Sequence, residues 1–334
     1  MKTENASWRS VNSAFWVLML ALVLTVLYKL GDSYVVMHLV SSQDKVLVSM
    51  VYLTLGGAIG LMINFVLCQT PLGKIVDKSY TSIKGVSVKA HKLAFVSGIL
   101  GATSTGIYLY AMTLLDPSLV VPLTSLAVVY ISVVEAIRGR ISFRRVLPSL
   151  FLVLLGVAVF FYVTITGNWQ LLIPVLAMIL LGHNTLNALS EVISKDAIDA
   201  SDAVSFNFWR FLWLAVSGVL ISLVLVIYLG KFDVYLGLLT KTALSFEFLV
   251  FVSVLMIVVF FAQALASRGV ALSDATTKNI IMTGTIVFSV FATLLASFLL
   301  PQYFEFKDVS SLDWVLRFIG AGLLTWGIVL VRKL

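Results

Sequence analysis

The feature that most constrains this chain is a succession of apolar runs, each about as long as a membrane-spanning helix. A helix needs about 20 mostly apolar residues to cross the hydrocarbon core of a bilayer. Ten stretches meet this requirement, at residues 14–38, 45–68, 92–115, 117–138, 143–165, 170–194, 203–229, 246–267, 275–300 and 313–332. The sequence therefore predicts an all-α polytopic membrane protein with ten transmembrane helices joined mostly by short loops.

The composition agrees with a membrane protein and argues against a soluble one. Of the 334 residues, 60% are hydrophobic and 12% are charged, whereas soluble domains carry about 25% charged residues. The net charge of +7 reflects lysine and arginine in loops rather than nucleic-acid binding. Because the first apolar run is too long for a signal peptide, we expect it to be an uncleaved transmembrane helix.

The basic residues divide unequally between the two alternating sets of loops. One set holds sixteen of them: Lys2, Arg9, Lys74, Lys78, Lys84, Lys89, Lys92, Arg138, Arg140, Arg144, Arg145, Lys195, Arg268, Lys278, Arg332 and Lys333. The other set holds four: Lys45, Lys231, Lys241 and Lys307. Because Lys and Arg favour cytoplasmic loops, we expect both termini in the cytoplasm, with the protein integral to a prokaryotic plasma membrane.

Two short sequence matches relate the halves of the chain. VLYK at 26–29 aligns with VISK at 192–195, 166 residues later, and LLGVAV at 154–159 aligns with TWGIVL at 325–330, 171 residues later. The matches predict two five-helix repeats, at 14–165 and 170–332. An odd number of helices places the second repeat upside down in the membrane, and such inverted repeats are typical of secondary transporters.

The stretch GIYLYAMTLLDPSLVVPLTSLAVVYISVVEAIRGRISFRRVLPSLFLVLLGVAVF, residues 106–160, carries a family resemblance. It has a tyrosine and an alanine late in one helix, a very short turn, a proline in the next helix, a charged loop and a final helix with Leu-x-Gly-Val. The second half offers SRGVALSDATTKNIIMTGTIVFSVFATLL and GAGLLTWGIVLV. The chain resembles the drug/metabolite transporter superfamily, in its EamA-like branch.

This resemblance implies a function. Members move a small metabolite by alternating access, through a central cavity between the two repeats, without enzyme activity or a cofactor. The resemblance further implies that the first, third, fourth, sixth, eighth and ninth helices line the path. We therefore expect a small-molecule substrate and the lipid bilayer as the partners of this chain.

Polar residues share one face of the helix predicted at 170–194. His183, Asn187 and Glu191 follow at intervals of four residues, which places them on one side of a helix. Polar groups in hydrocarbon are costly and face the bundle interior or a watery path. This cluster either packs helices through hydrogen bonds or contacts substrate, with His183 or Glu191 titrating. The predicted substrate-binding residues of the central cavity are Tyr108, His183, Asn187, Gln263 and Asn279.

A second group of charged residues is a candidate for gating or coupling. Lys29 lies near the end of the first apolar run with Asp32 three residues on, so it either anchors the helix at the interface beside Asp32 or lines an outer vestibule and meets an anionic group. Glu135, Glu191 and Arg210 all fall one to two turns inside the cytoplasmic boundary. They form either a structural ion-pair network or an inner gate.

Three motifs keep other interpretations open. GGAIG at 56–60 permits close helix contact, within the chain or in a homodimer. Asp196, Asp199 and Asp202 are spaced as in Mg²⁺-dependent membrane prenyltransferases, although Asp202 can equally cap the next helix. Intramembrane carboxylates would also suit a divalent-cation carrier or channel, and a scaffold protein is a further alternative. No metal-ligand spacing such as H-E-x-x-H occurs, so we predict no metal site.

Overall fold

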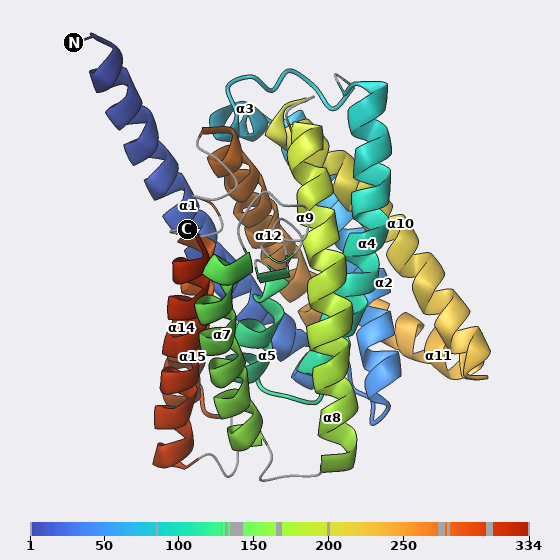
Figure 1. Ribbon diagram of the computed structural model, residues 1–334. Helices are drawn as coiled ribbons and strands as arrows, with labels where there is room; N and C mark the ends of the chain where they lie inside the picture. Colours follow the sequence, from blue (N-terminus) through green and yellow to red (C-terminus); the bar gives the residue numbers. More distant parts are fainter. Residues whose placement is uncertain are drawn as a thin grey trace.

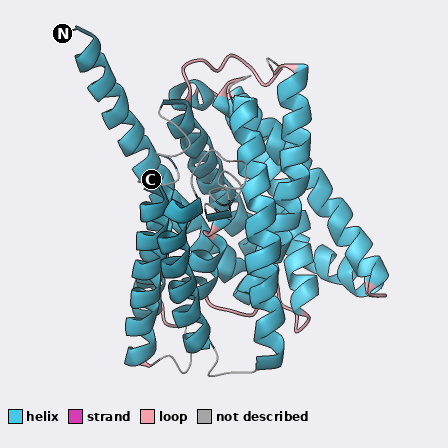
Figure 2. Cartoon of the chain, in the orientation of Figure 1, coloured by secondary structure: helices cyan, strands magenta, loops and turns pink. Residues whose placement is uncertain are grey.

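The computed structural model describes residues 2–84, 86–127, 129–130, 133, 143–164, 169–198, 201–272, 278, 281–304 and 310–332. These residues form helices and no strands (Figure 2). Within this described part of the chain, seven helical stretches are long and apolar enough to cross a membrane: Ala14–Leu39, Lys45–Gln69, Val88–Met112, Ile173–Ile198, Ala203–Tyr228, Phe246–Gly269 and Ser311–Leu330. The all-α class is confirmed, and the helices indicate an integral membrane protein.

The first half of the chain contains α1 (Lys2–Tyr34), the π-helix η1 (Val35–Leu39), α2 (Lys45–Gln69), α3 (Leu72–Val76), α4 (Val88–Met112), α5 (Pro117–Thr124) and α7 (Phe143–Thr164). The second half contains α8 (Trp169–Ala177), the π-helix η2 (Met178–His183), α9 (Asn184–Ile198), α10 (Ala203–Tyr228), α11 (Phe232–Ala243), α12 (Phe246–Leu272), α14 (Gly284–Leu299) and α15 (Ser311–Arg332). The long helices run roughly side by side, and α1 extends beyond the bundle at its N-terminal end (Figure 1).

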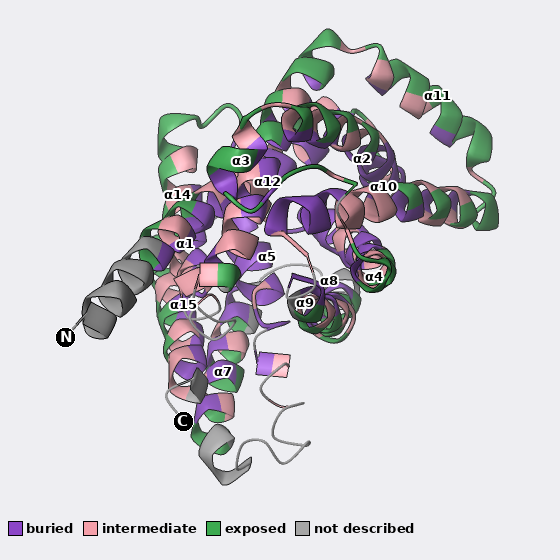
Figure 3. Cartoon of the chain, turned by 90° about the horizontal axis from the view of Figure 1, so that it is seen from above, coloured by how far each residue is buried: buried purple, intermediate pink, exposed green. Residues whose placement is uncertain are grey.

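Helices from the two halves interlock in the bundle. α1 packs against α12, α4 packs against α9 and α10, and α2 packs against α10 and α12. α7 packs along α15, and α5 packs along α14. Seen from above, α7 and α15 lie together at one side, while α2 and α10 lie at the other (Figure 3). We call the end of the bundle that carries the 77–87 segment the upper end, and the end that carries the 40–44 segment the lower end, as in Figure 1.

The glycines of the GGAIG motif form a contact within the chain. A Cβ added at Gly57 would lie 3.4 Å from the Ala215 Cα of α10, and one at Gly60 would lie 2.5 Å from the Phe211 ring. Small residues allow α2 and α10 to approach this closely. Of the two interpretations of the motif, the intrachain contact is therefore the one that the structure contains.

Three predicted helices differ in extent from the structure. The helix expected at 117–138 is described as α5 only up to Thr124, where the Val121 carbonyl accepts hydrogen bonds from the hydroxyls of Thr124 and Ser125. Such side-chain bonds compete with the helical backbone ladder. Within the stretch expected at 275–300, α14 begins at Gly284. The helix expected at 170–194 continues to Ile198 and changes to a π-helix midway.

One element, α11, lies in a segment that was expected to be a loop. It is too short and too polar to cross a bilayer, so the search for apolar runs passed over it. Tyr235 anchors α11 to the bundle, because its buried hydroxyl lies 2.7 Å from the Thr54 hydroxyl of α2. The helix lies at the periphery near the lower end (Figures 1 and 3).

Candidate functional site: a central polar cavity

The interior of the bundle contains a cavity of about 310 Å³. Its walls come from both halves of the chain: α1, α2, α4 and α5 from the first, and η2, α9, α10, α12, α14 and Lys278 from the second. Ligand pockets generally measure about 300–1,000 Å³, so the cavity is suited to a small solute. The lining is apolar for the greater part and carries a few charged and polar groups.

The structure brings together seven of the nine residues that were predicted to form the site. Lys29, Tyr108, His183, Asn187, Glu191, Arg210 and Gln263 all line the cavity. The other two, Glu135 and Asn279, lie outside the described residues. Sequence periodicity therefore selected residues that share one space, although it could not show which of them contact each other.

A buried carboxylate, Asp32, lies in the cavity wall and is bound by two tyrosines. The Tyr52 hydroxyl from α2 donates to Asp32 Oδ1 at 2.5 Å, and the Tyr108 hydroxyl from α4 donates to Oδ2 at 3.2 Å. Only 7% of Asp32 is exposed. Because a buried charge needs hydrogen-bond partners, this pair of donors satisfies each carboxylate oxygen and ties three helices together.

Lys29 lies one turn before Asp32 on α1 and also faces the cavity. Its Nζ lies 5.8 Å from the centre of the Tyr108 ring, within range of a cation–π interaction. The sequence left open whether Lys29 is an interfacial anchor paired with Asp32 or a residue that lines a vestibule. In the structure Lys29 is on the cavity wall, and the hydrogen bonds shown for the Asp32 carboxylate come from tyrosines.

His183 ends the π-helix η2, midway along the helix that spans 169–198. Its Nδ1 lies 2.9 Å from the Ser104 hydroxyl and 3.0 Å from the Ser104 carbonyl oxygen of α4. The widened turn is held by Tyr130, whose hydroxyl donates to the Leu180 carbonyl, and by Asn184, whose amide donates to the Ile179 carbonyl. π-Helical turns recur at functional sites because they redirect side chains, and here the turn precedes the cavity face of α9.

Glu191 and Arg210 each contact a further residue that the sequence did not indicate as a partner. Glu191 of α9 forms an ion pair with Lys278, and both residues line the cavity. Arg210 instead donates to the Gln263 side chain of α12 at 3.2 Å and, more weakly, to the Ser190 hydroxyl at 3.5 Å. Because Glu135 lies outside the described residues, the network of Glu135, Glu191 and Arg210 stays a prediction, and the contacts that are described are Glu191–Lys278 and Arg210–Gln263.

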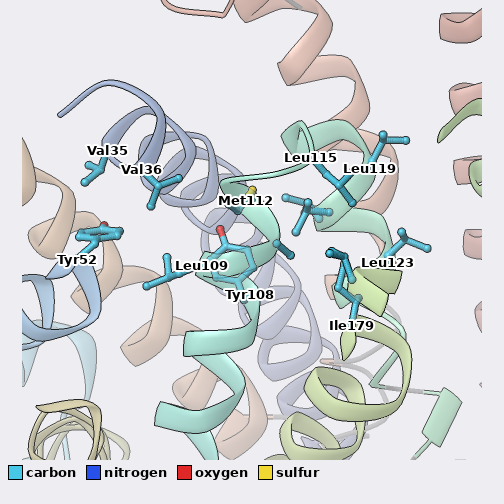
Figure 4. Packing of buried hydrophobic residues seen from close by; sticks show 14 of the residues in the cluster. Val35, Val36, Tyr52, Tyr108, Leu109, Met112, Leu115, Leu119, Leu123 and Ile179 are labelled. Atoms are coloured by element: carbon cyan, nitrogen blue, oxygen red, sulfur yellow. The ribbon is translucent and has the colours of Figure 1, made fainter. Parts of the chain in front are cut away.

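Apolar side chains close the cavity toward the lower end. Beyond Asp32 lie Val35 and Val36 of η1, and beyond Tyr108 on α4 lie Leu109 and Met112, all of them buried. Figure 4 shows Val35, Val36 and Leu109 near Tyr52, with Met112 farther along α4 toward Leu115. This packing separates the charged groups of the cavity from the lower end of the bundle.

Two ion pairs hold the elements beyond the cavity. At the lower end the Arg317 Nη2 of α15 lies 2.9 Å from the Asp116 carboxylate that caps α5. At the upper end the Arg268 Nη1 of α12 lies 3.0 Å from Asp77, which also accepts from the Ala203 amide of α10. Burial acts to raise the pKa of Asp77, but its hydrogen bonds and the Arg268 charge together hold it below the ordinary value.

Among the cavity residues that sequence reasoning missed are two charged residues and one tyrosine with a defined contact. Asp32 was treated only as a local partner of Lys29, Tyr52 was not considered, and Lys278 was assigned to a loop. An acid inside an apolar run was a usable signal for Asp32. Nothing in the sequence marks Tyr52, because its role depends on how α2 packs beside α1.

The aspartates considered for an Mg²⁺ site are arranged differently from such a site. Asp202 caps α10, as predicted, because its carboxylate accepts from the Ser205 amide at 2.8 Å. Asp196 is exposed, and Asp199 lies outside the described residues. The described part of the chain holds no group of three His, Cys, Asp or Glu side chains that could bind a metal ion.

No protein-family model matches the chain, and no curated protein matches its sequence. The case for a function therefore rests on the cavity and on the arrangement of the helices around it.

Proposed function

We propose that the chain is a secondary transporter of the drug/metabolite type, which moves a small organic solute by alternating access between two inverted five-helix repeats. The observation that favours this most is the central cavity, because charged and polar side chains from both halves of the chain face one space inside a bundle of apolar helices. Such groups are costly within a membrane unless they serve a path or a site.

The cavity wall supports the repeat. The sequence match at 26–29 and 192–195 pairs positions 166 residues apart. Under this pairing Thr25 corresponds to Glu191, and Tyr28 corresponds to Ser194, and all four residues line the cavity. α1 and α9 carry different residues at most positions, yet equivalent positions of the two helices line the same cavity. This is expected for duplicated elements.

The helix contacts support it as well. In the proposed repeats α1 is equivalent to the helix that ends in α9, and α12 is equivalent to α4. α1 packs against α12, and α9 packs against α4, so one contact is the counterpart of the other. α7 packs against α15, its own equivalent, and α5 packs against α14 in the same way. A twofold relation between the halves predicts this pattern.

The apolar packing at the lower end of the cavity fits one state of a transport cycle. The cavity extends to Ser194 and Ile198 of α9, near the upper end, while apolar packing closes it toward the lower end. The upper end is the one with the larger share of basic residues and is expected to face the cytoplasm. The structure then corresponds to a state that is closed on the outer side.

Counterflow in proteoliposomes tests the proposal. Purified protein is reconstituted with a high internal concentration of each of a panel of amino acids, organic acids, amines and sugars, and uptake of the same labelled solute is measured. We expect uptake of one solute class, reduced to the level of empty liposomes by Asn187→Leu, which replaces a cavity-lining amide with an apolar group of similar shape. Uptake that is the same with and without protein for the whole panel contradicts transport.

A further inference from the structure

The described part of the cavity wall carries more cations than carboxylates. Three cations, Lys29, Arg210 and Lys278, face two carboxylates, Asp32 and Glu191, among the described lining residues. Within a low-dielectric bundle each charge needs compensation nearby. The cavity wall that the structure describes therefore carries an excess of positive charge.

Both carboxylates have partners of their own. Glu191 is paired with Lys278, and each oxygen of Asp32 accepts a tyrosine hydroxyl. The ion pairs formed among the described residues include neither Lys29 nor Arg210. Among the described residues, these two cations therefore have no carboxylate within the 4 Å of an ion pair, although Asp32 lies one turn from Lys29 on the same helix.

The Arg210 guanidinium is fixed by hydrogen bonds to two uncharged side chains. Its terminal nitrogens donate to the neutral oxygens of Gln263 and Ser190, which fix the guanidinium without cancelling its charge. Its Nε is buried and has no hydrogen-bond partner. A guanidinium presents several donors in one plane and suits a carboxylate or a phosphate better than an ammonium does.

Apolar residues cover the remainder of the wall around these cations. Leu53, Phe211, Leu214, Met256 and Val259 all line the same cavity. At about 310 Å³ the space lies at the lower limit of ligand pockets, which favours a small solute. The lining is therefore suited to a small molecule with an apolar body and a single charged group.

We propose that the solute is a small organic anion, whose carboxylate or phosphate group is bound by Arg210 and Lys29 and whose apolar body packs against Phe211, Leu214, Met256 and Val259. This inference rests on the proposed transport function, because it names the substrate class of that same cavity. Of the two interpretations of Lys29, the proposal takes the one in which this lysine meets an anionic group, and it assigns that group to the solute.

Thermal unfolding of the purified full-length protein tests the charge preference. The probes share apolar bodies and differ in charge: 3-phenylpropanoate, 3-phenylpropanamide, 3-phenylpropylamine and 2-phenylethyl phosphate, with the corresponding 4-methylpentyl compounds, each up to about 10 mM at constant ionic strength. A ligand that binds the folded state raises the melting temperature. We expect a saturable rise with the carboxylate or the phosphate and none with the amide or amine.

A rise in melting temperature with only the carboxylate probe, or with only the phosphate probe, identifies which of these two groups the site binds. An equal rise with the amide or the amine contradicts the proposal, and so does the absence of a rise with every anion. Arg210→Gln and Lys29→Gln should each weaken the anion Kd by at least about tenfold. Arg210→Lys, which keeps the charge but loses the planar fork, should weaken it less.

A matched control is available outside the cavity. Lys241→Gln removes an exposed cation from α11 and should leave the anion Kd unchanged, whereas an equal loss in this variant means that bulk charge and not the site attracts the anion. An anion-dependent rise without counterflow of any solute contradicts transport but not the site. Counterflow of a neutral or cationic solute, without an anion-dependent rise, contradicts the anion site but not transport.

Discussion

Gly156 of α7 and Gly327 of α15 occupy reciprocal positions where these two helices cross. A Cβ added at Gly156 would lie 3.0 Å from the Gly320 carbonyl oxygen, and one added at Gly327 would lie 3.0 Å from the Ser149 carbonyl oxygen. Residues 149 and 320 are separated by 171 positions, as are residues 156 and 327. Under this offset the contact of Gly156 with Gly320 is the counterpart of the contact of Gly327 with Ser149. The two equivalent contacts support a twofold relation between the last helices of the two proposed repeats.

This contact makes a prediction about stability. Gly156→Ala and Gly327→Ala should each destabilise the protein by about 1–3 kcal/mol, because the new methyl group meets backbone of the opposite helix. Gly322, also in α15, has no heavy atom within 4 Å of an added Cβ, so Gly322→Ala should be neutral or slightly stabilising. Thermal unfolding in detergent measures all three, and equal effects would contradict the close approach.

The Asp32 site should depend on both tyrosines. Tyr52→Phe and Tyr108→Phe each remove one donor from a buried carboxylate, and each should cost about 1–3 kcal/mol. The effect of Tyr52→Phe should be the larger, since its hydrogen bond is the shorter. Tyr110→Phe changes a half-buried tyrosine of the same helix that does not line the cavity, and should have little effect on the melting temperature.

The Glu191–Lys278 pair offers a test by charge exchange. Glu191→Gln or Lys278→Gln leaves the other charge without its partner, and each should destabilise the protein by about 1–3 kcal/mol. Glu191→Lys combined with Lys278→Glu restores an ion pair and should recover much of that loss. A double-mutant cycle gives the coupling energy, and additive effects would show that the two side chains act independently.

Acid should weaken the upper end through Asp77. The pKa of this carboxyl is lower in the folded protein than in the unfolded chain, so its contribution to stability is complete above the unfolded value of about 3.9. That contribution is lost as the pH falls through the lower folded-state pKa. Asp77→Asn should flatten the dependence of the melting temperature on pH in this range, whereas Asp196→Asn, which alters an exposed residue, should not.

Much of the helical architecture could be predicted because hydropathy is a property of local sequence. The long apolar runs at 45–68 and 203–229 became α2 and α10 with ends within one residue of those expected. The amphipathic α11 could not be found in this way, because its position depends on the Tyr235–Thr54 contact with a distant helix. The early end of α5 depends on hydroxyl groups that compete with its backbone.

The cavity was predictable in part for a similar reason. His183, Asn187 and Glu191 share a face through helical spacing alone, and all three line the cavity. Their partners could not be predicted, because Ser104 and Lys278 come from elements distant in sequence. Asp32 shows the same limit, since its tyrosine donors belong to two other helices.

The most direct measurement of alternating access is the reactivity of one cysteine in the cavity from each side of the membrane. Asn187→Cys is made with Cys68→Ala, which removes the native buried thiol, and is labelled with a membrane-impermeant thiol reagent in right-side-out and inverted vesicles. Lys241→Cys and Lys74→Cys, exposed near the lower and upper ends, report which side each reagent reaches. The account predicts that residue 187 reacts from both sides while each control reacts from one. Reaction of residue 187 from only one side, in every condition tested, would contradict a cavity that opens alternately.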